Sequence, residues 1–321
     1  MLDLEAGLRG AALVDVSDRS RIRVAGEERL EYLHRITAQA FQELVPPCGA
    51  RAALLERTGK IVDVFTAHAF PDHVLLLGSR ANQERALSWL RRYIFRSRVR
   101  VEDRTAATGQ LLLTGPRSTE VAAALTGGTA VPLHGWAPIP GTASGLLIRT
   151  DAGGWLLLGE EEEISVLRAR ALQAGADHGL RFVGREIWTV LRILHGLPDG
   201  GAELDERTNP LEVGLDDSVS LTKGCFTGQE ALAKMVTYSS VKRRLAGLRL
   251  PPGEPPAAGA SLRSGGETVG RLTSATAVPG GDAAIALALV ARSGVRPGDR
   301  LQVEGSAGDA EVVELPFPAV R

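Results

Sequence analysis

The chain has 321 residues, of which 44% are hydrophobic and 23% charged, so it is long and apolar enough for two or three domains with buried cores. Its formal net charge of −1 gives no basic excess, which argues against a mainly electrostatic binder of nucleic acid. No apolar run reaches the ~18 residues of a membrane span, and the acidic first residues resemble neither a secretory signal nor a transit peptide. We expect a cytoplasmic protein without membrane or direct nucleic-acid contacts.

Cys48 and Cys225 are the two cysteines of the chain. Two thiols are too few for a disulfide framework, a structural zinc site or a four-thiolate cluster. The six histidines show no HExxH spacing and no pairing with cysteine. The sequence therefore predicts no built-in metal site and a reducing compartment.

Short strands and helices alternate through the first half of the chain. Apolar patterning predicts two strands around a polar turn, a helix, a hairpin turning at Gly59, a further strand and a second helix. These elements cover residues 13–18, 22–26, 27–36, 52–65, 73–77 and 82–93, and a similar order recurs over 111–113, 118–125, 145–148, 155–158 and 160–174. Repeated strand and helix units of this kind predict an α+β fold with helices on one side of the sheets.

The composition breaks most clearly at residues 251–256, Pro-Pro-Gly-Glu-Pro-Pro. Proline and glycine block both helix and central strand there, so the segment is interpreted as a boundary. Short strands are expected after it, over residues 261–263, 268–270, 285–290, 301–303 and 312–313. Their near-regular spacing predicts a small antiparallel barrel or sandwich.

The most unusual local sequence is Lys223-Gly224-Cys225-Phe226-Thr227-Gly228-Gln229-Glu230, which leads into an expected helix over residues 230–235. The glycines would let backbone N–H groups approach a ligand, and the helix start would favour an anion or a thiolate. The simpler alternative is a tight turn with a buried, inert cysteine, and composition alone favours it.

This octapeptide matches, at every position, the Lys-Gly-Cys-(Phe/Tyr/Ile)-x-Gly-Gln-Glu signature of the YgfZ group in the aminomethyltransferase superfamily. Other parts of the chain are similar to that group as well. They are residues 13–20, 29–35, 209–215, 241–248 and 269–274. The resemblance thus covers nearly the whole sequence.

The resemblance implies a two-lobed, α+β folate-binding region over residues 1–240, with interleaved lobes, and a C-terminal antiparallel β-barrel over 241–321. It implies tetrahydrofolate as the cofactor and iron–sulfur enzymes as partners, including those that methylthiolate tRNA. The function expected from it is a non-enzymatic accessory factor for assembly, maintenance or repair of iron–sulfur enzymes. The alternative is a folate-dependent aminomethyl or C1 transferase.

The resemblance also points to site residues. Cys225 would be the functional thiol. The ligand-contacting set would comprise Lys223, Gly224, Phe226, Gly228, Gln229, Glu230 and Arg192. In this set Lys223 and Arg192 would give cationic contacts, the glycines backbone access, and Gln229 and Glu230 the hydrogen bonds that fix the loop.

Two positions depart from the superfamily pattern. The T-protein branch carries an Asp pair whose second member acts at a folate nitrogen; here Asp63 takes the first position and Val64 the second, and valine cannot move a proton. Asp63 is expected to be a solvated strand residue, although a one-residue shift of register would restore it as a candidate. Where the family has a Glu that meets the pterin ring, this chain has Leu194, so folate binds more weakly or another group replaces the contact. His195 follows on an expected extended segment and is given a structural role.

Five arginines fall within residues 91–100. Arg91 and Arg92 fit the C-terminal end of a helix. Arg96, Arg98 and Arg100 alternate as on the solvent face of a strand. The functional alternative is a docking site for folate glutamate tails or for an acidic partner.

Overall fold

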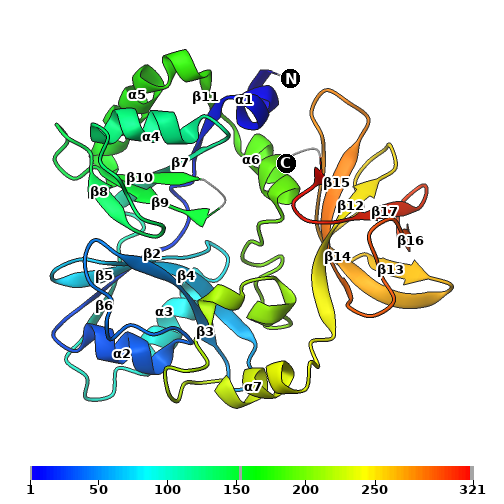
Figure 1. Ribbon diagram of the computed structural model, residues 1–321, viewed down its shortest axis with the longest axis horizontal. Coiled ribbons are helices and arrows are strands. Elements are labelled where there is room, and N and C mark those ends of the chain that lie inside the picture. Colours follow the sequence, from blue (N-terminus) through cyan, green and yellow to red (C-terminus); the bar gives the residue numbers. More distant parts are fainter. Residues whose placement is uncertain (1, 152–153, 319–321) are drawn as a thin grey trace.

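The computed structural model describes residues 2–151 and 154–318 and has three parts (Figure 1). The upper lobe contains a sheet of order β11-β1-β7-β10-β9-β8, in which only the β1–β11 pair is parallel. Its strands are β1 (Ala11–Asp15), β7 (Thr108–Thr114), β8 (Trp136–Pro138), β9 (Leu146–Arg149), β10 (Trp155–Glu160) and β11 (Leu180–Val183). Helices α4 (Ser118–Thr126) and α5 (Ile164–Ala174) cover one face of this sheet.

The lower lobe is built from the residues between β1 and β7, so the two lobes are interleaved in the sequence. Its sheet has the order β3-β4-β5-β2-β6. The strands are β2 (Arg21–Ala25), β3 (Gly49–Leu55), β4 (Ile61–Ala69), β5 (His73–Leu77) and β6 (Arg100–Asp103). Helices α2 (Arg29–Ile36) and α3 (Gln83–Arg92) pack on its outer face, as expected for helices on one side of each sheet.

Alternation along the strands joins the two lobes. In β5, Val74 and Leu76 pack among the side chains of α2 and α3, whereas Leu75 and Leu77 belong to the core of the upper lobe. Successive residues of a strand point to opposite faces, so one strand serves two cores. The inner faces of the two sheets therefore meet, and a site between them is enclosed by both.

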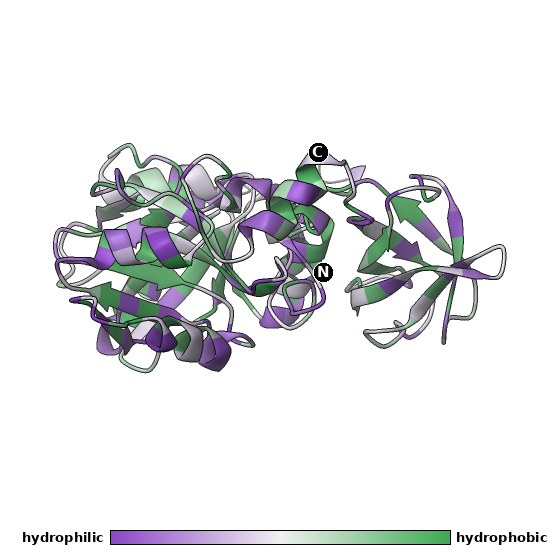
Figure 2. Cartoon of the chain, turned by 90° about the horizontal axis from the view of Figure 1, so that it is seen from below, coloured by the Kyte–Doolittle hydropathy of each residue, from purple (hydrophilic) through white to green (hydrophobic). Residues whose placement is uncertain are grey.

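The third part is a closed antiparallel barrel of order β12-β15-β14-β13-β16-β17. Its strands are β12 (Arg243–Leu250), β13 (Ser261–Ser264), β14 (Glu267–Ala277), β15 (Ala284–Ala291), β16 (Arg300–Val303) and β17 (Ala310–Val313). It projects from the lobes with apolar strands around its interior (Figure 2). Residues 251–256 connect β12 to β13 inside this barrel. The interpretation of the proline-rich segment as a boundary was therefore wrong, because the segment lies in the loop between two strands of the barrel.

Helix α6 (Arg185–His195) lies between the upper lobe and the barrel, and α1 (Leu2–Arg9) packs near it. Helix α6 is buried on more than one side, and its buried apolar residues are Ile187, Val190, Leu191 and Ile193. The helix ends where Gly196 adopts φ +71°, a conformation that suits glycine. The expectation of an extended segment at His195 was wrong, because His195 is the last residue of this helix.

The arginine-rich segment is only partly a strand. Arg91 and Arg92 close α3 as expected, but Arg96 has φ +57° and β6 begins at Arg100. Arg98 pairs with Glu27 and Glu28 in the loop. The expected alternation on a strand was therefore wrong for Arg96 and Arg98, which precede the strand.

Among the described residues, no helix has the length and apolarity that crossing a bilayer requires.

Candidate functional site

A cavity of about 200 Å³ lies where the two sheets and α6 meet. Most of its wall is apolar, with Leu77 from the lower lobe, Leu112 and Leu156 from the upper lobe, and Trp188 from α6. Charged and polar groups interrupt this wall at a few points. They are Arg19, Arg51, Thr66, Gln110, Thr150, Asp151, Arg192 and Asp199. An apolar pocket with a few converging polar groups is the usual form of a small-molecule site.

Asp199 is the carboxylate that follows α6 in the cavity wall. Its Oδ1 accepts hydrogen bonds from the Arg19 guanidinium at 2.8 Å and from the Gly200 N–H at 2.9 Å. Burial acts to raise the pKa of Asp199, but the charges of Arg19 and Arg192 outweigh it and hold the pKa below its usual value. Asp199 is therefore ionised at neutral pH and presents a fixed acceptor.

Arg192 is the one residue of the predicted ligand-contacting set that lines this cavity. Its guanidinium donates to Glu203 at 3.3 Å and to the Ser274 hydroxyl of β14 at 2.7 Å. The Ser274 hydroxyl in turn donates to Glu203 at 2.6 Å. Because Glu203 is fully buried, Arg192 both faces the cavity and neutralises a carboxylate at the junction with the barrel.

Gln110 of β7 also lines the cavity and is 1% exposed. Its backbone carbonyl accepts from the N–H of Val16, and its N–H donates to the Ser17 hydroxyl. Its side-chain oxygen, Oε1, has no hydrogen-bond partner. A buried acceptor without a partner costs about 1–3 kcal/mol, which a ligand donor would recover.

The structure places Asp63 and Val64 on opposite sides of β4. Val64 lines the cavity, whereas Asp63 is fully buried away from solvent and accepts hydrogen bonds from Ser79 and Asn82. Burial raises the pKa of Asp63 to about 6, although these donors oppose the rise. The expectation of a solvated Asp63 was wrong, because the loop that leads into α3 folds over it.

Leu194 and His195 at the end of α6 do not line the cavity. Leu194 packs against the core shared with the barrel, and its carbonyl accepts the N–H of Phe317 at 2.8 Å. Burial lowers the pKa of His195, which favours its neutral form. The helix thus directs Trp188 and Arg192, one turn apart, to the cavity instead.

Arg51 of β3 is one of the charged residues that line the cavity. It forms ion pairs with Asp151 and, at 2.8 Å, with Asp217. Ligand atoms of His134, Asp151 and Asp217 lie within 4.8 Å of one another, a grouping that could hold a cation. Because the Arg51 guanidinium already neutralises both carboxylates, we interpret this group as a polar link between the lobes.

The octapeptide loop, residues 223–230, lies elsewhere, beside the β3–β4 hairpin and before α7 (Gln229–Thr237). None of its eight residues lines the cavity, so the structure separates them from Arg192. Cys225 is exposed, which excludes the buried, inert cysteine that composition alone favoured. Glu230 is exposed as well and pairs with Lys234 along α7 at 2.7 Å.

Phe226 and Lys223 hold this loop against the lower lobe. Phe226 is buried with Leu55 and Ile61 of the hairpin. The Lys223 ammonium donates to the His34 carbonyl and lies 5.2 Å from the centre of the Phe226 ring. Burial lowers the pKa of Lys223 to about 8. Both side chains are used for anchoring, while Cys225 between them faces solvent.

The two loop glycines should respond differently to alanine. Gly228 has φ +87°, and a Cβ there would lie 2.6 Å from the Glu56 carbonyl oxygen; Gly224 has φ +101° but open space around it. We expect Gly228→Ala to lower the free energy of unfolding by about 2 kcal/mol and Gly224→Ala by about 1 kcal/mol. Urea unfolding of both variants measures this, and equal losses would contradict the proposed contact with the hairpin.

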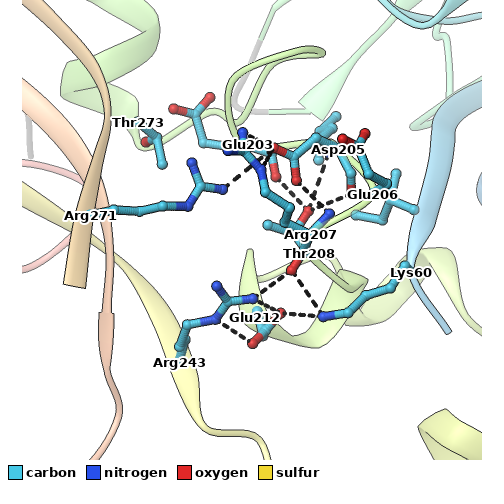
Figure 3. Close-up of polar contacts among 12 residues, drawn as sticks. Lys60, Glu203, Asp205, Glu206, Arg207, Thr208, Glu212, Arg243, Arg271 and Thr273 are labelled. Atoms are coloured by element: carbon cyan, nitrogen blue, oxygen red, sulfur yellow. Dashed lines mark hydrogen bonds and ion pairs between the residues drawn. The ribbon is translucent and has the colours of Figure 1, made fainter. Parts of the chain in front are cut away.

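A second polar network fixes the base of the segment that carries the loop (Figure 3). Glu212, which is 5% exposed, accepts from Arg243 of β12 at 2.8 and 2.9 Å and lies 3.6 Å from the Lys60 ammonium. It also completes a capping box with Asn209. Residues on both sides of the loop segment are thereby joined at one carboxylate.

Sequence reasoning did not identify Arg19, Gln110, Trp188 or Asp199 as cavity residues. They come from a turn, a strand, a helix and a loop, and Gln110 and Ser17 are 93 positions apart although hydrogen-bonded. No local spacing marks them. An Arg or Gln inside an apolar stretch is the one signal available, and it does not say which cavity the side chain reaches.

The chain shares its fold with a known enzyme. It superposes on the crystal structure of the glycine cleavage system aminomethyltransferase T from Bartonella henselae with a TM-score of 0.83, at 21% identity, covering 99% of this chain and 89% of the other. At that identity the likeness establishes the fold alone.

Sequence relatives extend over the same length. A chloroplastic protein of Arabidopsis thaliana, named as a candidate transferase, is 30% identical over 98% of this chain and 73% of its own length. The aminomethyltransferase of Moorella thermoacetica is 30% identical over 96% of this chain and 86% of its own, and that of Lysinibacillus sphaericus is 27% identical over the same shares.

Two family models match the chain and together leave few residues outside. Residues 3–223 match the GCVT N-terminal domain, which corresponds to the two lobes, α6 and the start of the octapeptide loop. Residues 243–318 match the glycine cleavage T-protein C-terminal barrel domain, which begins at the first barrel strand, β12. The chain therefore belongs to the glycine cleavage T-protein family.

Proposed function

We propose that this protein is a tetrahydrofolate-binding accessory factor that supports the assembly, maintenance or repair of iron–sulfur enzymes in the cytoplasm, with Cys225 as its functional thiol. The observation that carries the proposal is the exposure of Cys225 on a loop whose neighbours, Phe226 and Lys223, are anchored. A thiol held outward on a fixed loop is accessible to a partner. The match of this loop to the YgfZ signature supplies the class of partner.

The cavity residues fit a reduced pterin. The volume of the cavity, about 200 Å³, is below the range usual for whole drug-sized ligands. The cavity would therefore hold the bicyclic ring of tetrahydrofolate, with the glutamate end of the ligand outside. Apolar side chains and Trp188 would contact the ring faces. The unpartnered Oε1 of Gln110 and the ionised Asp199 would accept N–H groups. Bound tetrahydrofolate would bring a carrier of one-carbon groups to this cavity.

Aminomethyl transfer is the second candidate, favoured by the relatives that are named aminomethyltransferases and by the carboxylate of Asp199 in the cavity. Val64 argues against it, because this side chain faces the cavity where the transferase pattern has a carboxylate. Incubation with an aminomethyl-loaded carrier protein and tetrahydrofolate separates the two functions. Catalytic turnover would replace our proposal by the transferase.

Replacing Cys225 tests the role of the thiol. One thiolate cannot hold a cluster alone, so a cluster contact would be shared with the client protein. We expect Cys225→Ala to reduce the activity of an iron–sulfur enzyme at least tenfold in cells that depend on this protein. The melting temperature should stay unchanged, because the side chain is exposed.

Cys48→Ala is the matched control, since Cys48 is half-buried and belongs to no motif. Full client activity in the Cys225 variant would remove the thiol from the function. Loss of client activity in both variants at equal protein level would show that general thiol chemistry, and not this loop, is required.

A further inference from the structure

Building on the folate binding proposed above, we further propose that Asp199 and Gln110 together recognise the amino-oxo edge of the pterin ring. They would supply the acceptors that the leucine at position 194 cannot. Arg19 would act as a positioning residue for Asp199. This assigns substrate selection to two cavity residues that come from different elements and lie far apart in the sequence.

The chemistry of the ligand sets what these residues must offer. A 2-amino-4-oxopteridine presents the N3–H and the 2-amino group side by side, so this edge of the ring needs two hydrogen-bond acceptors. In Asp199, Oδ1 already accepts from Arg19 and Gly200. Within the part of the chain that the structure describes, no hydrogen bond reaches Oδ2. One carboxylate oxygen is therefore fixed by the protein and the other is open to the ligand.

Gln110 supplies the second, independent observation. Its side chain is almost fully buried, lines the cavity and leaves Oε1 without a partner. A buried amide in an apolar wall is costly unless a ligand completes its hydrogen bonds. The amide offers one acceptor and two donors, which matches a ring edge where N–H and C=O groups alternate.

One segment of the chain fixes both groups. The backbone of Gln110 is hydrogen-bonded to Val16 and Ser17, and Arg19, two residues further, holds Asp199. The backbone N–H of Asp199 also donates to the buried Glu203 at 3.0 Å. The backbone of Gln110 and the carboxylate of Asp199 are thus both held by the segment between β1 and β2.

Titration calorimetry with tetrahydrofolate tests the proposal on the full-length protein. We expect Gln110→Leu to raise Kd at least tenfold, because the ligand loses a buried partner while the wall keeps its volume. Asp199→Asn should raise Kd by a similar or larger factor. The wild-type protein should bind a tetrahydrofolate analogue without the 2-amino group (the 2-desamino ligand) at least tenfold more weakly than tetrahydrofolate. The Gln110→Leu and Asp199→Asn variants should show a smaller difference in Kd between these two ligands.

Gln173→Leu and Asp177→Asn are matched controls on exposed positions, and both should bind like the wild type. If Asp199→Asn does not fold, as judged by its melting curve, Gln110→Leu and the 2-desamino ligand decide. Wild-type binding that neither variant weakens, with no discrimination against the 2-desamino ligand, would overturn this assignment and leave the proposed function standing. No binding by the wild type would overturn both.

Discussion

Glu212→Gln is expected to lower the free energy of unfolding by about 3 kcal/mol. The substitution keeps the size of the side chain but removes the charge that neutralises Arg243 and Lys60 (Figure 3). Breaking a buried pair costs about 3–5 kcal/mol because one charge stays without its partner. The Arg243 side chain is 31% exposed, so solvent relieves part of that cost and the lower end applies. Urea unfolding of the two proteins measures the difference.

Glu230→Gln is the control, since it makes the same chemical change in an ion pair whose side chains are 84% and 64% exposed. Exposed pairs of this kind contribute little to stability, because solvent screens both charges. Equal losses in the two variants would mean that the network at Glu212 does not join the loop segment to the barrel. A second readout is protease cleavage within residues 213–242, which should accelerate only in the Glu212 variant.

Asp63 should make the protein less stable as pH rises from about 4 to about 6. Its pKa is raised by burial from 3.8 in the unfolded chain to about 6 in the fold, so the folded state binds the extra proton in this window. Stability from this group is present at low pH and lost as pH rises. A shift of this size corresponds to about 3 kcal/mol.

The unfolding free energy of the wild type minus that of Asp63→Asn isolates this effect, because other titrating groups cancel. We expect the difference to fall by about 2 kcal/mol between pH 4 and pH 6, by about 3 kcal/mol between pH 3 and pH 7, and to stay level above pH 7. Asp309→Asn, at an exposed position, should give a flat difference throughout. A flat profile for Asp63→Asn would mean that the hydrogen bonds from Ser79 and Asn82 keep Asp63 ionised in the fold.

Elements with a strong local pattern were predictable from the sequence. The β3–β4 hairpin follows from two apolar strands around Gly59, which indeed has φ +76°. Helix α3 was expected within one residue at each end, because Ala86, Leu87 and Leu90 lie on one buried face. Each of these elements buries one face against a single neighbouring surface. The spacing of its apolar residues is therefore visible within a short stretch of sequence.

Helix α6 was not predicted from the sequence in this way. It packs against the upper lobe and the barrel, so Arg192 and Ile193 are buried beside the helical stripe formed by Ile187, Val190 and Leu191. Asp63 was misjudged for a related reason, since its partners Ser79 and Asn82 are 16 and 19 positions away. A strand sequence shows which residue is polar but not what later folds over it.

For the candidate site, sequence resemblance and structure pointed to different regions. The octapeptide around Cys225 was recognisable because it is contiguous, and its exposure is now visible. The cavity is lined by residues from six or more separate segments, of which Arg192 alone belonged to the predicted set. Contiguous motifs mark loops, whereas a cavity between sheets draws one or two residues from each element and leaves no motif.

The interleaving of the lobes has a consequence for the order in which a nascent chain can fold. The lower-lobe sheet, β2 to β6, is complete once residue 103 has been synthesised. Strand β1 precedes it but pairs with β7 and β11, where Ala11 lies opposite Leu180. The first strand can therefore pair with β7 only after residue 114 has been synthesised, and its other edge stays open until β11, which ends at Val183, has left the ribosome. Such long-range pairing slows folding and prolongs exposure to aggregation, so β1 is the segment at which a chaperone would matter most.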